Sequence, residues 1–505
     1  MPDRIRSMLF NSTQFMVFFA IVAACYFAIP RRFRWCFLLA ASYYFYACWK
    51  PGYALLIVFT TLVDYASGIR MAAAPNRSIR RRYLLLSLCS NLGLLFFFKY
   101  YNFFNDALQP LFAPIGLHLP ASHFLLPVGL SFYTFQSLTY TIGVYRGTIQ
   151  PERHLGVFAC FVCFFPQLVA GPIERAENLI PQFRTLASKY SMGSPVLARF
   201  EYARVTDGLK LMAWGLFQKV VIADRIAVIV DEAFNHPSQY PGVCIAVAVV
   251  FFAFQIFFDF SGYSDIAVGS AQVLGFRLTA NFRRPYFATS IADFWRRWHI
   301  SLSTWFRDFV YIPLGGNQTS AFRWGAIVAL VFLLSGLWHG ANWTFLVWGG
   351  LHGGYLIAGR FLRPWRAAAI QMLGINRFPI LLRLFQSVCT FALVCFAWIF
   401  FRASSLDQAI EVIQSLFCGW NIVAEPARMG RTLLSMGLGR DDFLITAAML
   451  GIVAAVHWFQ EKLGSVREAL SRQPIVVRWT AYSALLWAIF LFGVFQHKEF
   501  IYFTF

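Results

Sequence analysis

The chain has 505 residues, of which 59% are hydrophobic, 19% aromatic and 13% charged. About a quarter of the residues of a typical soluble protein are charged, so this composition excludes an ordinary soluble enzyme and indicates a polytopic membrane protein. The formal net charge is +20, but Lys and Arg lie in short clusters between hydrophobic runs. The positive-inside rule and anionic headgroups favour this pattern, so we expect membrane lipids and not nucleic acid as partners.

The first hydrophobic run indicates a retained membrane span. Residues 15–29 are apolar and are followed by Pro30 and a basic RRFR segment instead of a small-residue cleavage site. The run is therefore not predicted to be a cleaved signal peptide. Translation could begin at Met1 or at Met8.

Further runs with the length and composition of membrane helices follow along the whole chain. A helix needs about 20 mainly apolar residues to span a bilayer, and several runs are shorter. We therefore predict an all-α polytopic membrane protein, a single domain over residues 1–505, with roughly a dozen membrane elements, some of them re-entrant or interfacial. Segments 172–207 and 402–442 are expected to form interfacial helices and loops. The runs are 13–30, 35–49, 51–69, 83–104, 124–145, 155–171, 208–230, 242–262, 321–338, 341–359, 380–401, 443–460 and 476–495.

Basic loops predict the orientation. The clusters at 31–34, 70–82 and 360–377 should be cytoplasmic, which puts the N-terminus outside, and the segment 103–123 should be external.

Cysteines provide no metal or disulfide pattern. The ten are scattered singly except for Cys160 and Cys163, which lie in an apolar helix without further ligands, so we predict packing and no metal site.

The segment FFDFSGYSDIAVGSA places Asp259 and Asp265 in an apolar helix that Gly262 could break. An intramembrane Asp suggests a functional site, and helix capping at a break explains the same pattern. Both readings stay open.

The stretch FWRRWHISLSTWFRDFVYIPLGGN, residues 294–317, carries a cluster of charge between apolar segments. If residues 295–309 form one helix, Arg296 and Ser303 fall within about 60° of His299 and would make a catalytic face. An interfacial helix with Trp at headgroup level and Arg on phosphate is the alternative.

His339 is the sharper signal, because no other ionisable residue lies between Arg323 and His352. Burial favours the neutral imidazole, which is a competent general base and contributes about 100- to 10,000-fold in rate. A histidine hydrogen-bonded between helices is the structural alternative. Gly336 and Gly340 would let a neighbouring backbone or an acyl chain approach.

His352 should lie about 220° from His339 if the helix is continuous, so His299 is preferred as its partner. Serine-hydrolase, P-loop, dinucleotide and zinc-protease motifs are absent from the sequence. Histidine-centred chemistry that needs no metal is what remains.

Five segments together carry a family resemblance. They are NFRRPYFATSIADFWRRWHISLSTWFRDFVYIPLGGN, SGLWHGANWTFLVWGGLHG, FFPQLVAGPIER, FQIFFDFSGYSDIA and the closing FIYFTF. In these segments the chain resembles the membrane-bound O-acyltransferase (MBOAT) family, in its bacterial alginate O-acetyltransferase branch, over nearly the full length from Met8.

The resemblance implies a helical core crossed by a tunnel, with the acyl donor reached from the cytoplasm and the hydroxyl acceptor from the other side. The family's histidine falls on His339 and its second polar position on His299. It also implies acetyl-CoA as donor, an exported polysaccharide as acceptor, a periplasmic or surface partner of the serine-esterase-like type, and the bacterial inner membrane as location.

The expected function is therefore O-acetyl transfer to an exported polysaccharide. His339 would be the general base, and His299 would orient the reactants or stabilise developing charge. The alternatives are a transporter or export channel, and an acyltransferase for teichoic acid, lipid or protein. Weaker candidates for binding substrate or lining the tunnel are Arg296, Ser303, Asp308, Trp338 and Asn342.

Overall fold

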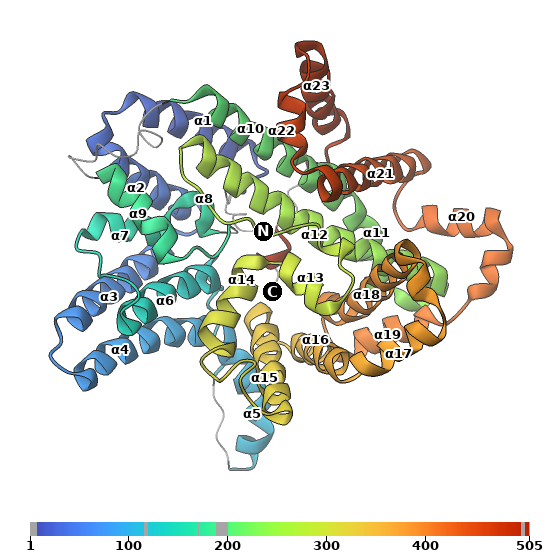
Figure 1. Cartoon of the computed structure of the whole chain (residues 1–505), viewed down its shortest axis with the longest axis horizontal. Helices are drawn as coiled ribbons and strands as arrows, with labels where there is room; N and C mark the ends of the chain where they lie inside the picture. Colours follow the sequence, from blue (N-terminus) through green and yellow to red (C-terminus); the bar gives the residue numbers. More distant parts are fainter. Residues whose placement is uncertain (1–7, 116–119, 170, 188–199, 496–499, 504–505) are drawn as a thin grey trace. The chain divides into compact units, whose positions relative to one another are not determined.

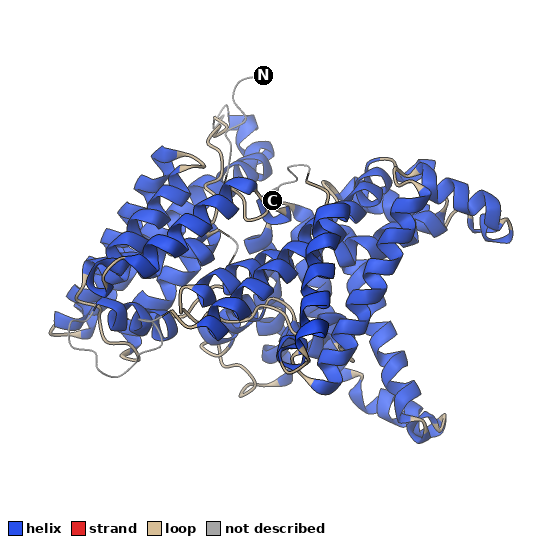
Figure 2. Cartoon of the chain, turned by 90° about the horizontal axis from the view of Figure 1, so that it is seen from above, coloured by secondary structure: helices blue, strands red, loops and turns tan. Residues whose placement is uncertain are grey.

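The computed structural model describes residues 8–115, 120–169, 171–187, 200–495 and 500–503. Every regular element in these ranges is a helix, and the described residues contain no strand (Figure 2). The prediction of an all-α protein is confirmed.

The chain divides into two compact units. Unit 1 comprises residues 1–215 and 263–280, and unit 2 comprises residues 216–262 and 281–505. The long helix α12 (Gly242–Val273) begins in unit 2 and ends in unit 1. The single domain over residues 1–505 stays a prediction.

The described residues of unit 1 form helices and the segments that connect them (Figure 1). Helix starts follow local capping: Ser12 Oγ accepts the Phe15 N–H, and Asn76 Oδ1 accepts the Ile79 N–H. Its elements are α1 (Thr13–Ala28), α2 (Arg31–Ala47), η1 (Pro51–Tyr53), α3 (Ala54–Ala73), α4 (Arg77–Leu95), the π-helix η2 (Phe96–Tyr100), α5 (Tyr101–Phe112), η3 (Ala113–Ile115), α6 (Leu130–Arg146), α7 (Leu155–Cys163), α8 (Phe165–Leu168), α9 (Ala176–Ala187) and α10 (Tyr202–Leu216).

The interior of unit 1 has a polar centre between α3 and α4. Asp64 is fully buried and accepts hydrogen bonds from Ser87 Oγ (2.6 Å) and Asn91 Nδ2 (2.9 Å). On the same helix, a Cβ at Gly68 would lie 2.5 Å from Tyr140 Oη of α6, so the two helices approach closely only because this residue is glycine.

Unit 2 carries the candidate site. Its elements are the π-helix η5 (Phe217–Ala223), α11 (Asp224–Asn235), η6 (Pro237–Gln239), most of α12, η7 (Pro285–Phe287), α13 (Ile291–Arg297), α14 (Ile300–Phe306), the π-helix η8 (Arg307–Tyr311), α15 (Ala321–His339), α16 (Trp343–Phe361), α17 (Arg363–Met372), η9 (Ile375–Arg377), α18 (Pro379–Arg402), α19 (Leu406–Leu416), η10 (Trp420–Ala424), α20 (Pro426–Ser435), α21 (Arg440–Leu463), α22 (Val466–Ser471), α23 (Ile475–Phe492) and η11 (Ile501–Phe503).

Seven helical segments of the described chain are long and apolar enough to cross a membrane, and each predicted apolar run contains a helix. The chain is a multi-pass membrane protein; which side each loop faces stays a prediction. The seven are residues 51–73, 77–112, 242–273, 321–339, 379–402, 440–463 and 475–492.

Two predicted elements differ in detail. The run 155–171 is not one helix, because α7 ends at Cys163 and α8 restarts at Phe165, beside Pro166. Conversely, α12 continues through Gly262, so the helix break that Gly262 could have introduced beside Asp259 is absent.

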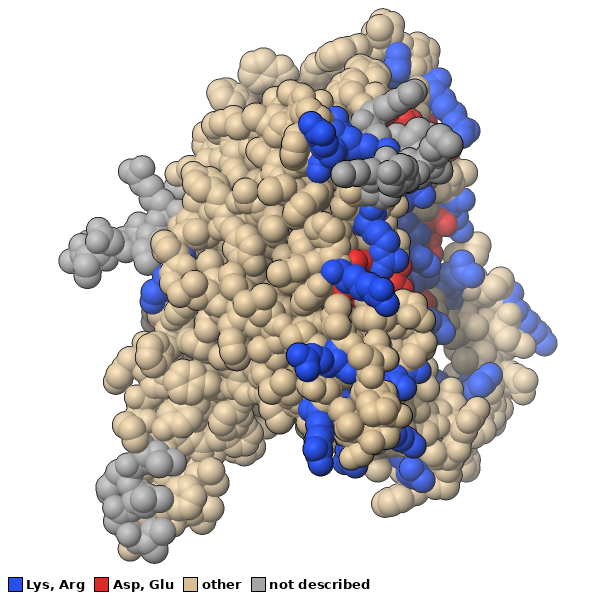
Figure 3. Space-filling model, turned by 90° about the vertical axis from the view of Figure 1, so that its left-hand side faces the viewer, with Lys and Arg blue, Asp and Glu red and all other residues tan. Residues whose placement is uncertain are grey.

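The charged surface also fits a membrane protein. On the face drawn in Figure 3, Lys and Arg side chains gather along one side, and a broad adjoining area carries no charged side chain. This is the distribution that basic headgroup-level residues beside an apolar belt produce.

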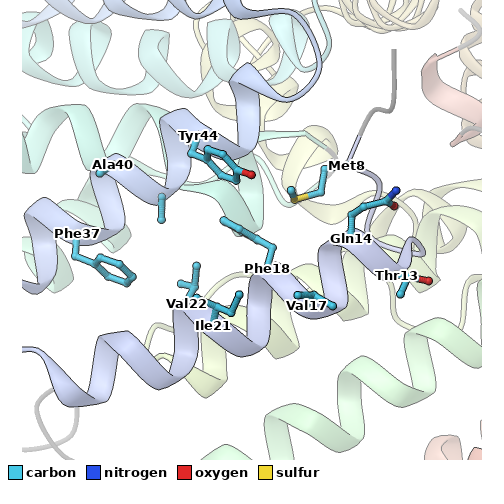
Figure 4. Close-up of a pocket in the computed structure, with 11 residues that line it drawn as sticks. Met8, Thr13, Gln14, Val17, Phe18, Ile21, Val22, Phe37, Ala40 and Tyr44 are labelled. Carbon is cyan, nitrogen blue, oxygen red and sulfur yellow. The ribbon is translucent and has the colours of Figure 1, made fainter. Parts of the chain in front are cut away.

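A groove of about 790 Å³ lies between α1 and α2 in unit 1 (Figure 4). It is lined mainly by apolar side chains, among them Val17, Phe18, Ile21 and Phe37, and no histidine, cysteine or charged residue lines it. The groove therefore offers no imidazole, thiol or carboxylate for catalysis.

Candidate active site

His339 is the last residue of α15 and is 2% exposed. The chain turns directly after it, and α16 starts at Trp343. This turn is tight: a Cβ at Gly340 would lie 2.0 Å from the Phe345 ring, and one at Gly336 would lie 2.2 Å from the Phe345 carbonyl oxygen. The predicted role of these glycines in close packing around His339 is confirmed.

His299 is fully buried at the junction of two short helices. Its backbone is left-handed (φ 42°, ψ 55°), a conformation that costs a residue other than glycine about 1–3 kcal/mol. Its Nδ1 accepts the Leu302 N–H at 3.3 Å and caps α14. Because Nδ1 is the acceptor, Nε2 carries the proton of the neutral ring.

Asn281 stabilises this junction. Its carbonyl oxygen accepts the Ile300 N–H at 2.9 Å, and its side-chain Oδ1 accepts the Ser301 hydroxyl at 2.6 Å. These bonds fix the turn in which His299 lies.

The prediction of one helix over residues 295–309 is wrong. The chain breaks between α13 and α14, with Trp298 extended and His299 left-handed. The helical-wheel placement of Arg296 and Ser303 beside His299 therefore does not apply. No Gly or Pro marks this break in the sequence.

The two histidines nevertheless lie near each other, with ring centroids 6.5 Å apart. Trp338 contacts both rings edge-on, at 5.0 Å from His339 and 5.9 Å from His299. The structure thus brings together His299, His339 and Trp338, three of the seven residues predicted for the site.

Tyr502 of the C-terminal segment lies beside both histidines. The sequence did not point to it as a site residue. Its ring lies 5.5 Å from that of His339 and 6.5 Å from that of His299. Phe260 of α12 lies 4.7 Å from His299 and 4.6 Å from Tyr502. The only signal in the sequence was that Tyr502 belongs to the closing FIYFTF segment.

A buried ion cluster holds the C-terminal segment in this position. Lys219 Nζ lies 2.6 Å from Asp259 Oδ1 and 2.8 Å from Asp224 Oδ1, and all three side chains are at most 4% exposed. Asp259 Oδ2 in turn accepts the Ile501 N–H at 2.8 Å, one residue before Tyr502. Of the two readings of Asp259, capping at a helix break is excluded because α12 is unbroken.

The π-helix η5 explains the position of Lys219. In a π-helix the hydrogen bonds run from residue i to i+5, so residues five apart lie on one face. Lys219 and Asp224 have this spacing. An α-helical wheel would have separated them, and the sequence analysis missed the pair.

The remaining candidates contact other groups. Arg296 is largely exposed and pairs with Asp293 (3.4 Å), and Asp308 pairs with Arg307 (2.7 Å). Ser303 Oγ donates to the Trp298 carbonyl oxygen at 3.1 Å. Asn342 caps α16, where its Oδ1 accepts the Thr344 N–H, and its Nδ2 donates to the Ser404 carbonyl oxygen.

His352 lies on α16 and not on a continuation of the helix of His339, so the 220° angle does not apply. Its Nδ1 accepts the Trp295 indole N–H at 3.3 Å. Trp348 separates it from His339, with ring centroids 5.0 Å from each. Asp265 lies on the unit 1 part of α12.

Burial sets the protonation of the site. Desolvation lowers the pKa of His299 to about 3, so its ring is neutral at physiological pH. Burial likewise raises the pKa of Tyr502 well above its usual value, so the phenol keeps its proton. Among the described residues, no three His, Cys, Asp or Glu side chains gather as a metal site would require.

The buried rings of His299 and His339, with the Tyr502 phenol beside them, suit proton transfer to and from a reacting oxygen or sulfur atom. Acyl transfer to a hydroxyl is one reaction that requires such proton transfer. Comparisons with known proteins assign the same class. Residues 154–401 match the model of the membrane-bound O-acyltransferase family, MBOAT.

Curated relatives agree over most of the chain. It is 39% identical over 445 residues to the probable alginate O-acetylase AlgI of Pseudomonas aeruginosa, covering 87% of this chain and 81% of that protein. It is 34% identical to the peptidoglycan O-acetyltransferase of Helicobacter pylori (75% and 73% covered) and 27% identical to the teichoic acid D-alanyltransferase of Bacillus subtilis (56% and 70%).

The chain belongs to the membrane-bound O-acyltransferase family and is a membrane O-acyltransferase. Its resemblance to the alginate O-acetyltransferase branch is confirmed.

Proposed function

We propose that this protein transfers an acetyl group from acetyl-CoA for the O-acetylation of an exported polysaccharide. The observation that carries the mechanism is the buried pair of histidines, 6.5 Å apart between ring centroids. The relatives named for alginate and peptidoglycan acetylation support acetyl as the group and a glycan as the acceptor.

His339 acts as general base in this proposal. It removes the proton of the accepting hydroxyl as the oxygen attacks the thioester carbonyl, and the tetrahedral intermediate then expels the thiolate of the donor. The thiolate takes up the proton from the imidazolium. A base of this kind is worth about 100- to 10,000-fold in rate.

His299 acts on the developing oxyanion. Its Nδ1 is occupied by the Leu302 N–H, so Nε2 is the proton-bearing atom that can donate. Losing one such donor costs roughly 3–4 kcal/mol in the transition state. The strained backbone of His299 fits a residue whose position matters more than local stability.

The test compares His339→Ala with His352→Gln in membrane-inserted protein supplied with labelled acetyl-CoA and polymer. We expect His339→Ala to lose at least about 100-fold of the transfer rate. His352→Gln, at another fully buried histidine, should stay within a few-fold of wild type. Full transfer by a correctly inserted His339→Ala protein would remove His339 from the mechanism.

The location and partner belong to the same proposal. We place the protein in the bacterial inner membrane, with the donor approached from the cytoplasm and the acceptor reached through a serine-esterase-like partner outside. Reconstitution without an ion gradient tests this: acetyl transfer to polymer should require the partner, whereas transfer of D-alanyl groups to teichoic acid would assign another acceptor. Movement of polymer without bond exchange would favour the transporter alternative, which membership of an acyltransferase family does not support.

A further inference from the structure

Unit 2 contains a cavity of about 690 Å³. Its walls are α12, the segment 284–297, the first half of α18 and the last half of α21. Neither His299 nor His339 lines it.

The cavity is polar at one end and apolar along its length. On α18 the lining residues recur on one helical face, with Arg383 near the helix start followed by Ser387, Val388 and Phe391. On α21 they run from Leu450 to Lys462, a rise of about 18 Å along the helix. Ring contacts give the directions of the two helices: along α12, α18 runs from Trp398 beside Phe252 to Phe391 beside Phe254, and α21 runs from Phe443 beside Phe251 to His457 beside Phe257. The start of α18, with Arg383, and the end of α21, with Lys462, therefore lie toward the same end of the cavity.

The charged end is cationic overall. Four lining residues are Arg or Lys and two are Asp or Glu, so the difference is 4 − 2 = +2. Both acids are engaged: Glu461 pairs with Arg284 (2.6 Å) and Arg297 (3.2 Å), and Asp293 pairs with Arg297 (3.1 Å).

Arg383 and Lys462 form no ion pair with any described residue. Both side chains lie at the exposed rim of the cavity. They are therefore the two positive charges that an incoming anion would meet.

The apolar wall opens toward the surroundings of the protein. Ile380 is 85% exposed, and Leu384, Val388 and Trp458 are 57–60% exposed, although α18 and α21 are candidate membrane spans. A water-soluble anion gains nothing from this wall, whereas an acyl chain is stabilised by about 0.8 kcal/mol per buried CH₂. The polar end adjoins the basic segment 360–377, which is predicted to be cytoplasmic, on the side where anionic lipids attract Lys and Arg.

We propose that this cavity is a binding site for an anionic phospholipid of the surrounding leaflet. The headgroup phosphate lies between Arg383 and Lys462, and an acyl chain follows the apolar stripes of α18 and α21. The proposal does not depend on the acyl donor or acceptor of the enzyme.

The site borders the segment that carries His299. Phe257 and Tyr286, which line the cavity, pack on Trp298 with ring centroids 6.1 and 6.2 Å away. Arg284 has a left-handed backbone (φ 47°); among the described residues only it and His299 have this conformation without being glycine. A bound lipid would therefore support the strained segment 284–299 from outside.

The experiment measures phosphatidylglycerol binding to the full chain in phosphatidylcholine nanodiscs, by native mass spectrometry and with spin-labelled lipid. Each cation contributes about fivefold, so Arg383→Gln with Lys462→Gln should weaken binding roughly 25-fold. The matched control, Arg363→Gln with Arg377→Gln, removes the same charge from the exposed basic segment and should leave binding unchanged. Equal loss in both double variants, or no loss in the first, would overturn the proposal.

Two further experiments distinguish a bound lipid from other bound anions. Ala454→Trp fills the apolar wall without changing charge and should also abolish binding. Excess inorganic phosphate or coenzyme A should not displace the labelled lipid. Displacement by either compound would assign the cavity to a soluble anion and end the lipid proposal.

Discussion

Two buried carboxylate clusters show how the two units of this protein treat polar groups differently. In unit 1, Asp64 is surrounded by neutral donors, Ser87 and Asn91, from the next helix along the chain. In unit 2, Asp259 faces the ammonium group of Lys219 and the backbone of Ile501, 242 residues away.

The Asp64 cluster joins two helices that are neighbours in the sequence, whereas the Asp259 cluster holds a segment that is far away in the sequence. Neutral hydrogen bonds suffice to join α3 and α4, which are adjacent in sequence. An ion cluster in low dielectric instead costs several kcal/mol of desolvation per ion, and removing one partner strands the other charges. In unit 2 the ion cluster holds a segment that is distant in the sequence. This segment places Tyr502 beside both histidines.

The largest effect should come from Lys219→Met. This change leaves the carboxylates of Asp224 and Asp259 buried without a cation, which costs about 3–5 kcal/mol. Thermal unfolding in detergent should shift strongly downward, and acetyl transfer should be lost. The triple variant with Asp224→Asn and Asp259→Asn should recover most of the stability; an unshifted unfolding temperature in Lys219→Met would contradict the burial of the cluster.

Ile501→Pro should act on transfer more than on stability. Proline has no N–H, so the bond to Asp259 is lost, and a hydrogen bond to a charged group is worth about 1.5–3 kcal/mol. Relative to Ile501→Ala, which keeps the N–H, we expect roughly tenfold or greater loss of transfer rate. Equal rates in the two variants would show that this bond does not position the C-terminal segment.

Asp64→Asn should have a small effect. The amide keeps an acceptor for Ser87 or Asn91, no cation is stranded, and the expected cost is about 1 kcal/mol. Asp64→Leu should cost more, because the Ser87 hydroxyl then loses its acceptor and Asn91 Nδ2 keeps only the Ser87 carbonyl oxygen. Chemical unfolding of the two Asp64 variants measures the difference in their free energy of unfolding. If Asp64→Asn lost as much stability as Lys219→Met, the two clusters would not differ in their sensitivity to the loss of a charge.

Glu174 of unit 1 offers the smallest and most specific test, through pH. It is fully buried, and burial raises its pKa from 4.5, although Thr279 N–H and Asn178 donate to it. The folded state thus binds the proton more tightly than the unfolded state. Its contribution to stability is full below pH 4.5 and is lost as the pH rises through the raised pKa.

Glu174→Gln should therefore flatten this part of the stability curve. The unfolding temperature of the variant, relative to wild type, should increase from pH 4.5 upward. A difference that stays constant across this range would contradict the assigned direction.

The sequence predicted the parts of the fold and site that depend on composition and regular periodicity. Apolar runs located the membrane helices, and His339 stood out because its run has no other ionisable residue. The pairing of His299 with His339 rested on family resemblance, because the break at Trp298 and His299 has no Gly or Pro to announce it. Lys219 and Tyr502 were missed, since one needs π-helical spacing and the other a tertiary contact across the whole of unit 2.

The π-helix η5 has a consequence for insertions and deletions. A π-turn holds one more residue than an α-turn, so deleting a single residue between Phe217 and Ala223 would let the segment relax into a regular α-helix. Deleting one of residues 220–223 would leave Lys219 and Asp224 four apart, which an α-helix places about 40° from each other on one face. Deleting Phe217 or Gln218 would instead leave them five apart, about 140° around a regular α-helix, although no catalytic side chain had been removed. The ion cluster should therefore depend on where in η5 the chain changes length as well as on which residues it contains.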